Sequence, residues 1–88
     1  APKPKKPSRD AILALRSEVR KSEARLEKLN QMRDKLADKL ADPELYEDSN
    51  IGEMEVWQKK YAEVMDALHR AATLWLQDME RLETAERA

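Results

Sequence analysis

Regularly spaced basic side chains are the strongest candidates for function in this chain, because they could bind phosphate groups. Lys21, Lys28 and Lys35 recur every seven residues, which places them on one side of a helix at intervals of roughly 10.5 Å. Ammonium groups in such a row can follow the phosphate backbone of a nucleic acid. The alternative interpretation is an ordinary solvated coiled-coil face, on which acidic neighbours such as Glu18 and Asp34 weaken the field.

Further basic residues extend this candidate site toward the N-terminus. Residues 1–41 hold twelve basic and six acidic side chains, whereas residues 42–88 hold five and twelve. This asymmetry favours either two segments that attract each other or a basic surface for a partner. The candidate nucleic-acid-binding residues are Lys3, Lys5, Lys6, Arg9, Arg16, Arg20, Lys21, Lys28 and Lys35.

Side chains for catalysis or metal binding are sparse. The chain has no cysteine, and His69 is its single histidine. A general base or a metal ligand needs partners at hydrogen-bond or ligand spacing, and Glu63, Asp66 and Glu80 do not form a cage around His69. The acidic cluster between the predicted helices lacks the alternating ligand pattern of a calcium loop. We therefore expect no catalytic residue, no metal site, no cofactor in this segment, and no enzymatic activity of its own.

Composition restricts the fold class to helices. The 88 residues include one glycine and no phenylalanine, and 40% of them are charged, which is typical of long helices rather than of a sheet with many turns. No run of 18 apolar residues could span a membrane, and no apolar stretch follows the basic start as in a signal peptide. We expect an all-α, cytoplasmic protein segment without membrane contact.

Prolines and a helix-capping residue divide the chain into four predicted segments. Pro2, Pro4 and Pro7 predict a flexible Pro/Lys-rich linker over residues 1–8, of the kind that joins a domain to a longer chain. Ser8 is a good helix N-cap, and Pro43 disfavours helical backbone at Asp42. We therefore expect helix 1 at about 9–41, an acidic connector at 42–52 and helix 2 at about 53–86.

Both predicted helices carry a heptad seam, which predicts two long helices forming an antiparallel coiled-coil hairpin. The seam of helix 1 is Ile12, Leu15, Val19, Ser22, Leu26, Leu29, Arg33, Leu36 and Leu40. The seam of helix 2 is Met54, Trp57, Tyr61, Val64, Leu68, Ala71, Trp75 and Leu82.

We expect a register in which the numbers of facing residues in the two helices sum to about 94, because large side chains then face small ones in most layers. It places Ser22 opposite Ala71, and Arg33 over the ring of Tyr61. Asp78 is expected to break the seam, with Met79 taking its place as the apolar stripe drifts.

Other apolar residues have competing interpretations. Leu45, Tyr46 and Ile51 are expected to fold back over the open end of the helix pair. Trp57 and Trp75 suit core packing better than base stacking, and the methionines suit gap filling better than a plastic binding surface. Because a two-helix core is thin, docking on another domain or weak self-association is expected.

The segments "EARLEKLNQMRDKLADKLADPELYED" and "ALHRAATLWLQDMERLE" resemble the C-terminal coiled-coil domain of bacterial ABC-F ATPases, the Uup-like and YheS-like ABC transporter ATP-binding proteins. The specific elements are the "LADPELY" helix end and Trp75-Leu76. The resemblance covers about Asp10 to Glu83. It implies a parent protein whose N-terminal domains bind and hydrolyse ATP with magnesium, and which acts on ribosomes or DNA.

Two functions follow as expectations. The first is a non-catalytic interaction domain of an ABC-F ATPase that contacts DNA or ribosomal RNA through the linker and helix 1. The alternative is a structural coiled coil that docks on its own ATPase domains or self-associates, without binding nucleic acid. An unrelated coiled-coil arm, such as those of tRNA synthetases, would share the fold and the RNA contact.

Overall fold

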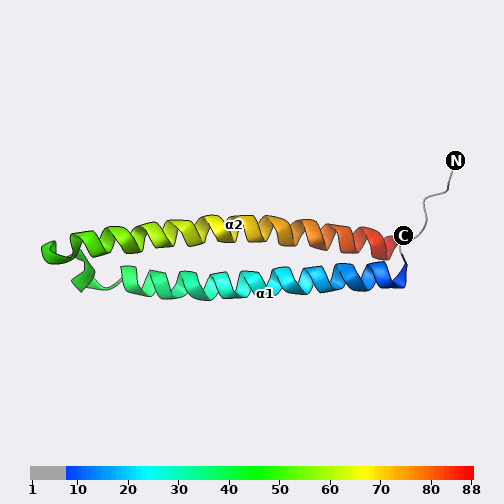
Figure 1. Ribbon diagram of the computed structural model, residues 1–88, viewed down its shortest axis with the longest axis horizontal. Helices are drawn as coiled ribbons and strands as arrows, with labels where there is room; N and C mark the ends of the chain where they lie inside the picture. The colour runs from blue at the N-terminus through cyan, green and yellow to red at the C-terminus, as the bar shows by residue number, and fades with distance from the viewer. Residues whose placement is uncertain (1–7) are drawn as a thin grey trace.

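The protein is an antiparallel helical hairpin, which confirms the predicted all-α fold (Figure 1). The computed structural model describes residues 8–88. Helix α1 (Arg9–Leu40) and helix α2 (Ile51–Arg87) are joined by two short 3₁₀ turns, η1 (Pro43–Tyr46) and η2 (Asp48–Asn50). The 37 residues of α2 give a rod of about 56 Å. Except for Ser8, the predicted linker lies outside the described residues.

Local signals explain where α1 begins and ends. The Ser8 hydroxyl accepts a hydrogen bond from the Ala11 amide at 3.1 Å, as an N-cap does. At the other end, Asp42 has extended backbone before Pro43, and its carboxylate accepts from the Glu44 amide at 3.0 Å. Helix α1 ends one residue before the expected boundary, and α2 begins two residues earlier than expected.

The connector closes one end of the rod with a single buried side chain. Leu45, which was predicted to fold back, is only 3% exposed. The same prediction was wrong for Tyr46 and Ile51, which are 53% and 47% exposed. The Tyr46 hydroxyl instead donates to the Leu40 carbonyl at 2.6 Å, which satisfies a carbonyl at the end of α1 that has no helical partner.

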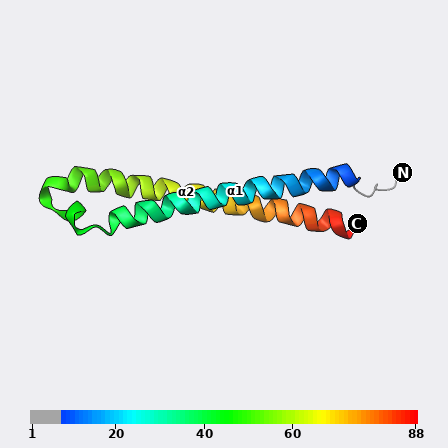
Figure 2. The same ribbon diagram turned by 90° about the horizontal axis from the view of Figure 1, so that it is seen from below.

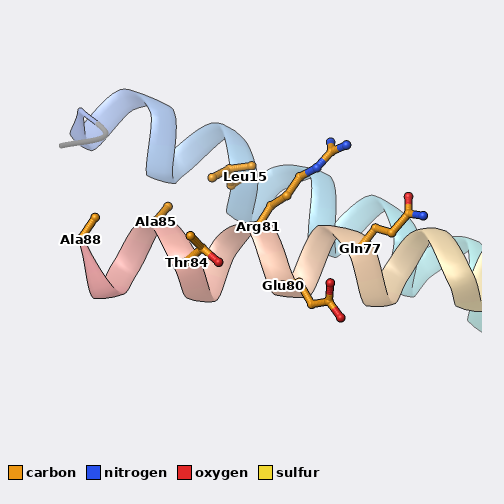
Figure 3. A pocket seen from close by; sticks show the side chains of 7 residues that line it. All are labelled: Leu15, Gln77, Glu80, Arg81, Thr84, Ala85 and Ala88. Atoms are coloured by element: carbon orange, nitrogen blue, oxygen red, sulfur yellow. The ribbon is translucent and has the colours of Figure 1, made fainter. Parts of the chain in front are cut away.

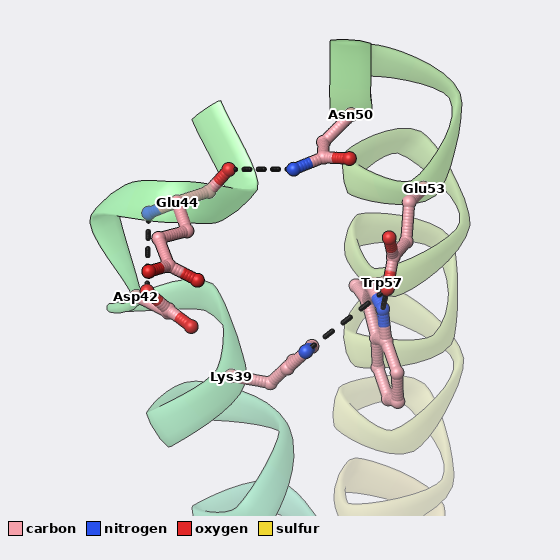
Figure 4. A network of polar contacts seen from close by, with 6 residues as sticks. All are labelled: Lys39, Asp42, Glu44, Asn50, Glu53 and Trp57. Atoms are coloured by element: carbon pink, nitrogen blue, oxygen red, sulfur yellow. Dashed lines mark hydrogen bonds and ion pairs between the residues drawn. The ribbon is translucent and has the colours of Figure 1, made fainter. Parts of the chain in front are cut away.

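Polar contacts hold the connector against the helices (Figure 4). The Asn50 side-chain amide donates to the Glu44 carbonyl at 2.9 Å, and the Lys39 ammonium lies 4.0 Å from a Glu53 carboxylate oxygen. These contacts link the end of α1, η1 and the first turn of α2. The start of α2 is therefore positioned by the connector as well as by α1.

The heptad seam is the core, as predicted. Each of the nine seam positions expected in α1 and the eight expected in α2 is buried or half-buried. Leu36, Val64 and Leu68 form the central cluster, against which Trp57 and Tyr61 pack. Both tryptophans lie on this seam, as the core-packing interpretation requires. No described side chain is less than 2% exposed, so the core is thin.

Asp78 does not break the seam, and that prediction was wrong. Asp78 is 6% exposed, and Ser22 on the facing helix is also 6% exposed. The Ser22 hydroxyl donates to the Asp78 carboxylate at 2.6 Å. A buried carboxylate is tolerated where a donor satisfies it, so the heptad continues through Asp78 to Ala85, which is also buried.

Polar pairs between the helices lie on both sides of the predicted register. The Ser22 hydroxyl donates to Asp78 and the Trp75 indole nitrogen donates to Glu23 at 3.3 Å, and the residue numbers of these pairs sum to 100 and 98. Lys39 lies 4.0 Å from Glu53 and 5.5 Å from the centroid of Trp57, and these numbers sum to 92 and 96, so the predicted sum of about 94 lies within the observed range. The seven-residue pattern fixes which faces meet but leaves the sliding of one helix along the other undetermined, and the polar layer at Ser22 favours the observed position.

The predicted stacking of Arg33 on Tyr61 was wrong as well. The Arg33 guanidinium binds the carboxylate of its neighbour Asp34 at 3.1 and 3.2 Å. Over residues 8–88, the cations found above aromatic rings are Lys39 and Lys60, both above Trp57. An adjacent carboxylate on the solvated side competes successfully for the arginine.

Candidate nucleic-acid interface

The predicted phosphate-binding residues do not share one surface. Lys3, Lys5 and Lys6 lie outside the described residues; Arg9, Arg16, Arg20, Lys21, Lys28 and Lys35 are all exposed on α1. At 100° per residue, Arg16 and Lys21 point about 140° apart. The three arginines therefore occupy one flank of α1, and the three lysines form the predicted stripe on another.

Two flanks of the rod can be defined from the seam. In both helices, the residues that directly precede seam positions face one side, and those that directly follow face the other, because g positions meet g positions in an antiparallel pair. A groove lined by Met32 and Lys35 of α1 and by Lys60 and Ala67 of α2 places the preceding residues of both helices together. A hollow lined by Asn30 of α1 with residues of α2 lies on the other flank.

The flank of the preceding residues is strongly basic. Eight basic and three acidic side chains occupy these positions in the described part of the chain, a net of five positive charges. We call this surface the basic face. Its basic members are Lys21, Arg25, Lys28, Lys35, Lys39, Lys60, Arg70 and Arg81, and its acidic members are Glu18, Glu53 and Glu63.

The opposite flank, which we call the acidic face, has the reverse balance. The residues that directly follow seam positions include two basic and six acidic side chains over residues 8–88. Arg16 and Arg20 belong here, and Arg9 lies one heptad earlier. The Arg16 guanidinium binds Glu86 of α2 at 3.2 Å. The acidic members are Glu23, Glu27, Asp34, Glu55, Glu83 and Glu86.

Few of the basic-face cations are paired. Lys21 lies 3.4 Å from Glu18, and Lys39 lies 4.0 Å from Glu53. The other ion pairs found over residues 8–88 are on the opposite flank, so the remaining six cations of the basic face have no carboxylate within 4.0 Å. Exposed, unpaired ammonium and guanidinium groups are the groups that neutralise phosphates.

Sequence reasoning missed the contribution of α2 to this face. Lys60, Arg70 and Arg81 lie in a helix that is acidic overall, and they were not predicted to bind phosphate. A signal was present, because Lys60 and Arg81 directly precede seam residues, as Arg25 and Lys39 do in α1. Near the chain ends, Arg81 extends from α2 toward α1 beside a shallow hollow floored by Leu15 and Ala85 (Figure 3).

The aromatic side chains are engaged by polar neighbours. The ammonium groups of Lys39 and Lys60 lie 5.5 and 4.8 Å from the centroid of Trp57, and the indole nitrogen of Trp57 donates to Glu53 at 3.3 Å (Figure 4). Trp57 thus already has two cations over its ring. The basic face offers charge at this point rather than an open platform for a base.

The remaining candidates for catalysis or metal binding are His69 and the carboxylates. His69 is exposed, and its carbonyl accepts from the Thr73 hydroxyl at 3.0 Å. Over residues 8–88, no group of three or more His, Cys, Asp or Glu side chains is placed to hold a metal ion. Within the same range, neither helix has the length and apolar character needed to cross a membrane.

Comparison with known proteins gives no relative: no family model, no curated protein and no solved structure matches this chain.

Proposed function

We propose that this hairpin is a non-catalytic interaction module that contacts the phosphate backbone of a nucleic acid, DNA or ribosomal RNA. In the full proposal it belongs to an ABC-F type ATPase, whose ATP-binding domains lie outside this chain. The chain preceding residue 1 would then contain two Walker motifs. Their absence from the natural gene would remove the ATPase part of the proposal and leave the phosphate contact standing.

The observation that carries the proposal is the charge difference between the two flanks. The basic face has a net of five positive charges, drawn from both helices. The lysine stripe of α1 supplies Lys21, Lys28 and Lys35, and α2 adds Lys60 beside Lys35 across a shared groove. Such a surface can lie against a backbone without reading its sequence.

The first experiment is a salt titration of the 88-residue chain with a fluorescent DNA duplex and a matched RNA duplex. If about five phosphates are neutralised, the logarithm of the binding constant falls with the logarithm of salt with a slope near −4.5. Binding that is absent at low salt, or that does not depend on salt, contradicts the proposal. The comparison of duplexes identifies the preferred nucleic acid.

The second experiment locates the contact with two triple variants of equal charge change. Lys28→Gln, Lys35→Gln and Lys60→Gln neutralise the basic face, and Arg9→Gln, Arg16→Gln and Arg20→Gln neutralise the arginines of the other flank. The first set should weaken binding most and flatten the salt slope by about 2.7 if all three groups contact phosphates. Equal losses would show that net charge, rather than this face, governs binding.

The predicted linker is tested separately. Replacing Lys3, Lys5 and Lys6 with glutamine measures its share of the affinity, and a loss greater than that of the basic-face variants would place the main contact before α1. The structural alternative, docking on ATPase domains or self-association, is favoured by one observation: Met32 and Leu74 on the basic face are 49% and 43% exposed.

A further inference from the structure

An apolar groove runs along the middle of the basic face. One part has a volume of about 540 Å³ and is floored by Leu29, Leu36, Trp57 and Val64. A second part continues it past Ala67 to Ala71 and Leu74. From Trp57 to Leu74 the groove covers about 26 Å of α2.

The rim of this groove is charged and mostly basic. Lys35 and Lys60 flank the first part together with Glu63, and Arg25 and Arg70 flank the second. Phosphates could pair with this rim, but they would leave the apolar floor uncovered. A ligand that satisfies both parts carries acidic groups on either side of an apolar ridge.

We propose that the groove binds an amphipathic helix whose apolar ridge is flanked by acidic side chains. The groove lies between the two helices, and its α2 positions, from Trp57 through Val64, Ala67 and Ala71 to Leu74, are separated by seven, three, four and three residues. This spacing matches the ridge of a third helix packed in a bundle. About five turns of the partner would lie on α1 and α2.

Charge disfavours the nearer occupants. A second copy of the chain docked by the same face would place Lys35, Lys60, Arg25 and Arg70 against an identical basic rim. The segment of residues 1–7 is itself basic and has no large apolar side chain. An acidic helix is the occupant whose charge complements the rim and whose side chains cover the floor.

This inference stands on the groove and does not require nucleic-acid binding. The two ligands share Lys35 and Lys60, so they should compete. They differ in the other groups that they need: the helix requires the apolar floor, whereas phosphate requires only cations. Variants of the floor and of the outlying lysines therefore separate one proposal from the other.

The test uses a fluorescein-labelled 21-residue peptide with leucine at heptad positions a and d and glutamate at e and g, and a matched peptide with lysine at e and g. The glutamates also keep the peptide from pairing with itself. Anisotropy should show saturable binding of the acidic peptide, with the lysine peptide at least tenfold weaker because it meets the basic rim with like charge. Equal affinity for both peptides, or no saturation by the acidic one, overturns the proposal.

Two matched double variants identify the surface. Met32→Gln with Leu74→Gln removes exposed apolar side chains from the groove, and Leu13→Gln with Leu76→Gln removes side chains of similar exposure, 49% and 54%, from the other flank. All four positions are exposed, so circular dichroism should show intact helices. We expect peptide binding to fall at least tenfold for the first pair only. Equal loss in both pairs contradicts the assignment.

Two further measurements separate the alternatives. Lys21→Gln with Lys28→Gln, outside the groove lining, should lower nucleic-acid affinity and leave peptide affinity within about twofold. Sedimentation of the wild type should show a monomer. A dimer that the Met32→Gln and Leu74→Gln variant dissociates would identify a second copy as the occupant and overturn the acidic-helix proposal.

Discussion

The half of the rod near the connector and the half near the chain ends are built on different principles. Near the connector, Leu36, Val64 and Leu68 form an apolar cluster, and Leu45 closes the end. Near the chain ends, the seam contains the polar pair of Ser22 and Asp78. The first half gains its stability from burial, whereas the second combines the buried Val19, Ala71 and Ala85 with a hydrogen bond that depends on how the two helices are aligned.

This difference teaches how a thin coiled coil can be both stable and specific. Leucine and valine pack acceptably against several facing positions, so the apolar cluster discriminates poorly between registers. A buried carboxylate tolerates few neighbours, because leaving it without a donor is costly. We therefore assign stability mainly to the cluster and alignment mainly to Ser22 and Asp78.

The largest effect should come from the apolar cluster. Leu68→Ala removes a side chain that is 8% exposed, and such truncations cost about 2–5 kcal/mol in unfolding free energy. Urea unfolding followed by circular dichroism measures the loss. Leu76→Ala, at a position that is 54% exposed, is the control and should change stability little. Equal losses would refute the assigned role of the cluster.

A smaller effect is expected at the polar layer. Asp78→Leu leaves the buried Ser22 hydroxyl without its partner, which costs about 1–3 kcal/mol. Replacing both residues, as Ser22→Ala with Asp78→Leu, removes the unsatisfied group and should recover most of that stability. Thermal unfolding of the single and double variants measures the coupling. Additive losses would mean that the hydrogen bond does not hold the layer together.

The smallest effect is expected at the ion pair between Arg16 and Glu86. Both side chains are about half exposed, at 51% and 43%, and exposed pairs contribute about 0–1 kcal/mol. Arg16→Gln should lower the melting temperature slightly at low salt and not at all at high salt. A large loss of melting temperature at every salt concentration would show that this pair near the chain ends contributes more to stability than an exposed ion pair should.

Periodicity predicted the fold because burial on a helix repeats every three to four residues whatever its partner is. It therefore identified the seam and the antiparallel hairpin. It failed at Asp78 because the partner hydroxyl of Ser22 comes from the other helix, and at Tyr46 because the acceptor is a carbonyl. The Ser22 contact depends on the alignment of the two helices and the Tyr46 contact on the local path of the connector, and periodicity encodes neither.

For the candidate site too, features within one helix could be predicted from the sequence, and features that join the two helices could not. The lysine stripe of α1 was predicted from its spacing and is exposed as expected. Its separation from Arg16 and Arg20 follows from the turn of α1 alone. Lys60 of α2 lies near the stripe because of the way the two seams face each other. Charge counted along the chain divides this protein into a basic helix and an acidic one, whereas charge counted around the rod divides it into two flanks.

The position of the connector adds a direction to this charge pattern. The ends of α1 and α2 at Arg9 and Arg87 lie together, and the connector lies at the far tip of the rod (Figures 1 and 2). That tip carries the carboxylates Asp42, Glu44, Glu47 and Asp48. The molecule thus has an electric dipole across its width and a negative pole at its tip. A polyanion approaching end-on would be repelled by these carboxylates and turned toward the flank that carries the excess of cations.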